Sequence, residues 1–159
     1  MKYRCLTYRE LDLMNADFRE FLYENGTNMY EWNILNDQSH VLATSLLEEY
    51  SDRTLEKVMD EVEYINHFTG NELLSYQFTP NFYHLIRLKF LDKMNDHQVY
   101  SLNNLLEQVE TQGLKCSKST YTYKVPKAQL CFQLIENGAI SSDEAIYDQL
   151  SYLRKTFQN

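Results

Sequence analysis

The sequence predicts a single α+β domain over residues 1–159, and a change in the spacing of its apolar residues supports this prediction. Through residues 1–62 apolar side chains recur every three to four positions, which is the period of an α-helix. In the mixed half, 63–159, the pattern changes to alternation, which is typical of β-strands. The alternating segments are 63–68, 82–90 and 119–125. We therefore expect a helical N-terminal half, a small sheet of about three strands, and C-terminal helices packed on it.

Helix-end signals divide the first half. Thr7 and Glu10 have the spacing of a capping box, in which a hydroxyl and a carboxylate satisfy free amide groups where a helix begins. Gly26 stands where that helix would end. Thr27 can cap a short second helix through residues 28–35, and the helical pattern then continues from residue 41 to residue 62. Ser51 and Asp52 could cap a new start within it, so the pattern allows either one bent helix or two.

The second half mixes the two patterns. Thr69 and Glu72 again have capping-box spacing, which favours a short helix through residues 73–78. Three further helices are predicted, over 101–110 with Gly113 at its end, over about 130–135 with Gly138 at its end, and from Ser141–Glu144 onward.

Composition limits the class of protein. The three cysteines are odd in number and far apart, which fits reduced thiols better than a disulfide framework or a zinc site. The opening MKYRCLTYRE has no apolar run, so we expect no signal peptide, and no stretch approaches the roughly 20 apolar residues of a membrane span. Glycine loops that bind phosphate or dinucleotides are absent from the sequence. We expect a cytoplasmic protein with no membrane contact and no cofactor.

Charge is distributed unevenly along a chain whose formal net charge is -8. Residues 1–72 hold fifteen acidic and six basic residues, a net charge of -9, whereas residues 73–159 hold eight acidic and nine basic residues, a net charge of +1. The first half should therefore repel a phosphate backbone.

The first part of the chain also carries a family resemblance. The opening MKYR-x-LT is followed by DFREFL, by the single Trp in YEWNIL, and by SDRTLEKVMDEVEY before a strand. Over about the first 90 residues, these markers resemble a family of small uncharacterised cytoplasmic proteins from Bacteroidota. The resemblance implies a soluble bacterial protein, and because that family has no assigned activity, it implies no catalytic residue. Cys5 stands where the family pattern has a second basic residue.

Catalytic and metal-binding patterns are weak. His67 and His84 lie on two predicted strands that could pair, but neither has further ligands at a recurring spacing, so we expect no metal site. Cys116 follows Lys115 and precedes Lys118, and these cations could lower the pKa of its thiol. An enzyme of unrecognised class that uses His67, His84 or Cys116 is one alternative.

The stretch Leu114–Lys127, LKCSKSTYTYKVPK, contains four lysines and no carboxylate. Strand alternation would put Tyr121 and Tyr123 on one face and Lys118 and Lys124 on the other. Nucleic-acid platforms need rings and cations on the same side, so this pattern argues against a nucleic-acid partner. It favours a solvated strand, an edge that lysines protect against aggregation, or contact with an acidic protein surface.

The acidic helical half, the thirteen tyrosines and the lack of catalytic spacing favour a non-enzymatic protein-binding or adaptor module, with a protein partner or self-association. A weak nucleic-acid binder that uses Lys115–Lys127 is the other alternative. Trp32 fits a buried core position as well as an interface. The candidate interface residues are Tyr23, Tyr30, Trp32, Lys118, Tyr121, Tyr123 and Lys124.

Overall fold

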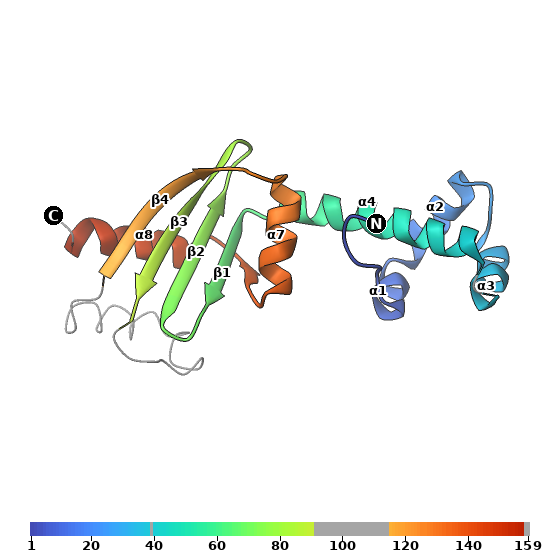
Figure 1. Cartoon of the computed structure of the whole chain (residues 1–159), viewed down its shortest axis with the longest axis horizontal. Coiled ribbons are helices and arrows are strands. Elements are labelled where there is room, and N and C mark those ends of the chain that lie inside the picture. Colours follow the sequence, from blue (N-terminus) through green and yellow to red (C-terminus); the bar gives the residue numbers. More distant parts are fainter. Residues whose placement is uncertain (39, 91–114, 158–159) are drawn as a thin grey trace. The chain divides into compact units, whose positions relative to one another are not determined.

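The computed structural model describes residues 1–38, 40–90 and 115–157 (Figure 1). The chain forms two compact units, residues 1–58 and residues 59–159, and each is described by itself. We call them unit 1 and unit 2. The helix predicted over 101–110 lies outside the described residues.

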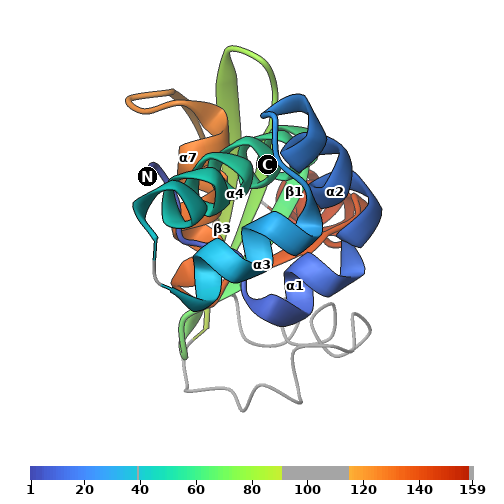
Figure 2. The same cartoon turned by 90° about the vertical axis from the view of Figure 1, so that its right-hand side faces the viewer.

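Unit 1 is helical, as the spacing of apolar residues predicts. Thr7 and Glu10 form the predicted capping box, and a turn at Met14 separates the first two helices. The long helix is continuous through Ser51, so the pattern over residues 41–62 forms one helix and not two. Figure 2 shows the three shorter helices gathered beside the long one. The helices are α1 (Tyr8–Leu13), α2 (Asn15–Glu24), α3 (Met29–Asp37) and α4 (Val41–Glu61), the last three residues of α4 belonging to unit 2.

The N-terminal segment is held against the middle of α4. The backbone amides of Lys2 and Tyr3 donate to the carboxylate of Asp52 at 2.6 and 2.8 Å. The amide of Leu6 donates to Ser51 Oγ at 3.0 Å, and this hydroxyl in turn donates to a backbone carbonyl of α4. Ser51 and Asp52 therefore bind the N-terminal segment, instead of capping a helix as the sequence allowed.

An aromatic cluster forms the core of unit 1. Phe18 packs edge-on against Trp32, with ring centroids 5.1 Å apart, and against Tyr50 at 4.8 Å. Phe21 also contacts Tyr50, at 5.2 Å. All four side chains are buried, and Trp32 Nε1 donates to the carbonyl of Ala43 at 3.3 Å. Because α2, α3 and α4 each contribute rings, this cluster holds the three helices together.

Unit 2 contains a five-stranded sheet in the order β4-β3-β2-β1-β5, in which every neighbouring pair is antiparallel (Figure 1). The strands are β1 (Tyr64–Phe68), β2 (Glu72–Phe78), β3 (Phe82–Lys89), β4 (Lys115–Thr122) and β5 (Ile140–Ser142).

The α+β class and the helical first half agree with the structure, but the expected sheet of about three strands is wrong. The segment predicted as a short helix after Thr69 is strand β2, and β5 was missed because it has only three residues. Gly70 has a φ of +74°, and the amide of Thr69 donates to the carbonyl of Glu72 at 2.9 Å, which closes a hairpin turn. The Gly70-Asn71 pair is a hairpin signal, and it prevails over the capping-box spacing around it.

Two C-terminal helices, α7 (Lys127–Glu136) and α8 (Ala145–Phe157), complete the described part of unit 2. α8 covers one face of the sheet, where Leu150 and Leu153 join buried side chains of β2, β3 and β4 in an apolar cluster. α7 contacts β1. It ends before Gly138, as the sequence predicts. α8 begins later than predicted because Ser141 and Ser142 belong to β5. We call the sheet face that α8 covers the inner face and the opposite one the outer face.

We expect Glu10 to link the stability of unit 1 to pH. The guanidinium of Arg4 makes two hydrogen bonds to the Glu10 carboxylate, at 2.9 and 2.7 Å. These bonds, with others from Thr7, lower the pKa of Glu10 from 4.5 to about 2. Because the folded-state pKa is depressed, the stabilisation is complete above pH 4.5 and is lost as the pH falls toward about 2.

Glu10→Gln should therefore lower the free energy of unfolding by about 1 kcal/mol near neutral pH, a modest amount because solvent screens this partly exposed pair. Urea unfolding at about pH 7 and about pH 3, followed by Trp32 fluorescence, measures the difference. The variant should differ less from the wild type at the acid pH. Glu20→Gln, an exposed carboxylate on α2, is the control. An equal loss of stability at both pH values would contradict the prediction.

Candidate functional site

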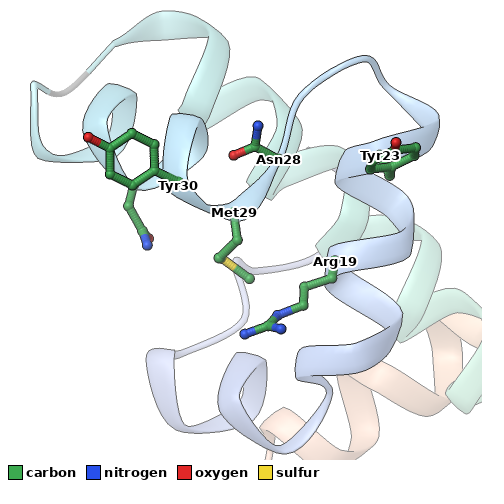
Figure 3. Close-up of a pocket in the computed structure, with 6 residues that line it drawn as sticks. Arg19, Tyr23, Asn28, Met29 and Tyr30 are labelled. Atoms are coloured by element: carbon green, nitrogen blue, oxygen red, sulfur yellow. The ribbon is translucent and has the colours of Figure 1, made fainter.

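A hollow of about 510 Å³ lies between α2 and α3 (Figure 3). Arg19 and Tyr23 line it from α2, and Tyr30 lines it from α3. In Figure 3 the side chains of Arg19 and Met29 lie in the middle of the hollow, with Tyr23 and Tyr30 to either side. The remaining lining residues are Asn28 and Asn33.

The turn between the two helices determines where the walls of the hollow lie. Gly26 has a φ of +73°, a conformation that residues with a side chain rarely adopt. The amide of Thr27 donates back to the carbonyl of Leu22 at 3.1 Å, which closes the end of α2. Asn28 and Glu31 then form a capping box that begins α3. The four residues 25–28 thus connect α2 to α3, and the two helices are in contact.

Helical spacing explains why the lining side chains point outward. On α2 the buried residues are Phe18, Phe21 and Leu22. Arg19 and Tyr23 are four residues apart, so they share another face of the helix. On α3 the only buried residue is Trp32, which leaves the rest of that helix at least partly open to solvent.

The hollow combines exposed rings with a free cation. The side chains of Tyr23 and Tyr30 are 81% and 74% exposed. Among the described residues, Arg19 makes no hydrogen bond or ion pair. The thioether of Met29 adds a flexible apolar surface that can adjust to the shape of a partner. A second hollow, of about 330 Å³, is lined by Thr27, Glu31, Ile34 and Leu35, so α3 contributes to both.

The candidate interface residues from the sequence fall into three groups. Tyr23 and Tyr30 line the same hollow. Trp32 is 4% exposed and lies in the aromatic core of unit 1, and it lines neither hollow. The others belong to β4 and the connection after it, in unit 2: Lys118, Tyr121, Tyr123 and Lys124.

Tyr121 and Tyr123 contact the same ring. Tyr83 on β3 stacks on Tyr121 with centroids 5.3 Å apart and packs against Tyr123 at 5.7 Å. The hydroxyl of Tyr123 donates to the carbonyl of Thr79 at 2.7 Å, and burial raises its pKa to about 12. Tyr123 is therefore a structural anchor between the β2–β3 turn and the chain after β4.

The lysines of this region have different surroundings. Lys118 lies on the inner face, where its Nζ is 5.3 Å from the centre of the Tyr147 ring, and Lys124 is exposed. Lys115 lies on the outer face, because it is six residues from Tyr121 on a strand with regular alternation. The strand register therefore places a cation, Lys115, on the same face as Tyr121. The alternation within residues 118–124 alone does not include this cation.

The three residues suggested for an unrecognised enzyme do not come together. His67 on β1 and His84 on β3 are separated by β2 and lie on opposite faces of the sheet. Cys116 shares the inner face with His84 but pairs with Leu88, four residues further along β3. Burial raises the pKa of the Cys116 thiol, opposite to the effect expected from nearby lysines.

In the described parts of the chain, no group of three His, Cys, Asp or Glu side chains is arranged to hold a metal ion. Over the same residues, no helix is both long enough and apolar enough to cross a membrane.

Sequence reasoning missed several lining residues of the hollow, Arg19, Asn28, Met29 and Asn33. The four-residue spacing of Arg19 and Tyr23 was visible in the sequence. It could have shown that these two residues share the face of α2 that the apolar residues leave free.

In the residues that the structure describes, the fold and the hollow define an α+β protein with a helical unit, an antiparallel sheet unit, and an open surface depression on the helical unit. The chain belongs to the Family of unknown function (DUF6495), whose model matches residues 1–155. Neither the curated proteins nor the solved structures contain a significant match to the chain.

Proposed function

We propose that this protein is a non-enzymatic protein-binding module of the bacterial cytoplasm, and that its partner docks on the hollow between α2 and α3. The observation that carries the proposal is the combination of Tyr23, Tyr30 and Arg19 around one open depression. The partner can be a different protein or a second copy of this chain.

The residue types support a protein partner. Tyrosine and arginine are enriched among the residues that dominate binding energy at protein interfaces, because a ring or guanidinium buries a large area and still makes polar contacts. Arg19 could pair with a carboxylate of the partner, since it has no partner of its own among the described residues. Sites for small molecules are usually more enclosed than a depression with two largely exposed tyrosines.

Among the described residues, unit 1 also holds most of the exposed large apolar side chains. Of the thirteen large apolar side chains exposed in the described residues, nine belong to unit 1. Tyr30 and Ile34 are four residues apart on α3, so two of the nine share one helix face. Exposed apolar side chains that gather on one surface often mark a protein interaction site.

The cytoplasmic part of the proposal depends on the thiols. Cys5, Cys116 and Cys131 form no disulfide, and a protein whose three thiols are reduced is better suited to a reducing compartment. The bacterial part depends on the resemblance described above.

Affinity purification from the native host followed by mass spectrometry tests the proposal. Proteins recovered with the wild type would then be titrated against purified wild type and the double variant Tyr23→Ala/Tyr30→Ala by isothermal titration calorimetry. We expect the double variant to bind its partner at least about 30-fold more weakly, because the loss of even one ring from the centre of an interface can cost about 2 kcal/mol. Arg19→Ala, tested separately, should weaken binding as well.

Tyr152→Ala is the matched control, because Tyr152 is also an exposed tyrosine on a helix but lies in unit 2. It should bind like the wild type. Trp32 fluorescence would show that unit 1 of the double variant is folded. The proposal fails if every recovered protein binds the double variant as tightly as the wild type, or if no recovered protein binds the purified wild type.

A further inference from the structure

The second unusual surface lies on two neighbouring strands of unit 2. The segments 82–90 and 115–127 contain β3, β4 and the connection to α7. They hold six basic residues and no carboxylate, a net charge of +6 in a chain whose net charge is -8. The six are Arg87, Lys89, Lys115, Lys118, Lys124 and Lys127.

Strand register separates these cations into groups. Arg87, Lys89 and Lys115 lie on the outer face of the sheet, the face that α8 leaves free. Lys118 lies on the inner face beside the Tyr147 ring, and Lys127 donates to the carbonyl of Asp60 at 2.5 Å. In Figure 1, β3 and β4 run side by side with α8 behind them. Three exposed cations thus occupy the ends of two adjacent strands.

The arrangement of these cations is electrostatically unfavourable without an anion. Lys89 and Lys115 are directly opposite each other across the β3–β4 ladder, and like charges in that position destabilise a sheet. Among the described residues, one carboxylate is nearby, that of Glu72, which is opposite Lys89 on β2 and 3.8 Å from the guanidinium of Arg87. Within the part of the chain that the structure describes, three cations therefore share one carboxylate, and a bound anion would relieve the remaining repulsion.

The rest of the strand offers a path for an extended ligand. Between Lys115 and Tyr121 the outer face of β4 presents Ser117 and Ser119, which are small and exposed. Their hydroxyls can donate hydrogen bonds to carboxylates. From Lys115 to Tyr121 the strand rises about 20 Å, the length of about six residues of extended chain.

The tyrosines on this face favour a protein segment over a nucleic acid. Tyr83 is packed among other rings, those of Tyr76, Phe78, Tyr121 and Tyr123. Tyr121, at 44% exposed, is therefore the one tyrosine on this face that is largely accessible among the described residues. Single-stranded nucleic acids bind through several free ring faces, and the acidic remainder of the chain would repel a long phosphate backbone.

We propose that the outer face of β3 and β4 binds an acidic, extended segment of a protein partner, whose carboxylates pair with Arg87, Lys89 and Lys115. This second site lies in unit 2 and goes beyond the function proposed for the hollow of unit 1.

The test uses the full-length protein and a fluorescein-labelled octapeptide of alternating Glu and Ser, with fluorescence anisotropy at low salt. We expect saturable binding by the wild type, and at least a 10-fold loss of affinity for the double variant Lys89→Gln/Lys115→Gln. Raising the salt concentration from about 50 to about 200 mM should weaken binding by the wild type, because the contacts are ionic.

Two controls distinguish the loss of specific charge contacts from a general change in net charge and from unfolding. Lys57→Gln/Lys155→Gln makes the same change in net charge at exposed lysines outside this surface and should bind the peptide within about twofold of the wild type. The melting temperature of Lys89→Gln/Lys115→Gln should equal or exceed that of the wild type, because a repulsive pair is removed. A weaker affinity would then come from the lost charges and not from unfolding.

The proposal is overturned if Lys89→Gln/Lys115→Gln binds the peptide like the wild type, or if the two double lysine variants lose affinity equally. It is also overturned if labelled oligothymidine of eight nucleotides binds more tightly than the peptide, which would assign the surface to nucleic acid. The Tyr23→Ala/Tyr30→Ala variant should bind the peptide normally, so this proposal and the function proposed for unit 1 can fail independently.

Discussion

Replacing Phe18 with alanine is expected to lower the free energy of unfolding of unit 1 by about 3–5 kcal/mol. Phe18 is 1% exposed, and its ring contacts Phe21, Trp32 and Tyr50 from α2, α3 and α4. Removing the ring leaves a cavity. Because the other contacts of the cluster fix the positions of the helices, a small movement cannot fill this cavity. Because small domains are stable by only about 5–15 kcal/mol, the variant should be close to unfolding.

Trp32 is the single tryptophan of the chain and lies in the same cluster, so its fluorescence reports the unfolding of unit 1 directly. Urea titration of wild type and Phe18→Ala measures the difference in unfolding free energy. Leu13→Ala is the control, since Leu13 is an exposed residue of α1, and it should change stability by less than about 0.5 kcal/mol. A loss below about 1 kcal/mol for Phe18→Ala would show that the cluster does not hold the helices together.

Leu150→Ala is expected to have a similar effect in unit 2, about 2–5 kcal/mol. Leu150 is fully buried and lies on the side of α8 that packs against the sheet. Its neighbours in the apolar cluster include Leu73 on β2 and Leu88 on β3, two rigid central strands. A helix on a sheet cannot move into the space left by one side chain without breaking its other contacts, so most of the cavity should persist.

Amide hydrogen exchange measures this effect where it occurs, because the amides of β2 and β3 exchange through the opening of the sheet. Their protection factors should fall in proportion to the lost free energy. Tyr152→Ala is the control on the same helix, where the side chain is largely exposed, and it should leave protection unchanged within about 0.5 kcal/mol. Unchanged protection in Leu150→Ala would mean that α8 does not stabilise the sheet.

The two proposed binding surfaces differ in chemistry. The hollow of unit 1 presents Tyr23, Tyr30 and Arg19 in an acidic helical unit, whereas the outer face of β3 and β4 presents cations around Lys89 and Lys115. A module with two such surfaces could hold two partners, or two parts of one partner, at once. The two sets of variants test each surface separately.

The sequence predicted most of unit 1 because helix signals are local. The Thr7–Glu10 capping box and the 3.6-residue period involve only residues within one or two turns of each other. The same period places Tyr23 on a face of α2 away from Phe18 and Phe21, so its exposure follows from spacing alone.

The sheet was predicted less well because strands depend on pairing between distant residues. Gly70 and Asn71 contain a hairpin signal, yet the nearby capping-box spacing also fits a helix, and only pairing with β1 and β3 decides for β2. The three residues of β5 carry no periodic pattern, and they form a strand because β1 offers a free edge.

The features of the candidate sites also divide into those that follow from local sequence and those that depend on tertiary structure. The sequence by itself determined the helical half, the charge distribution, and the outward position of Tyr23, because these depend on composition and on neighbours along one helix. Only the tertiary structure decided that Trp32 is buried, that Arg19 and Tyr30 line one hollow, and that Lys89 is opposite Lys115 on the face that carries Tyr121. The physical reason is that each of these depends on which surfaces pack together or which strands pair, and residues far apart in the chain settle both.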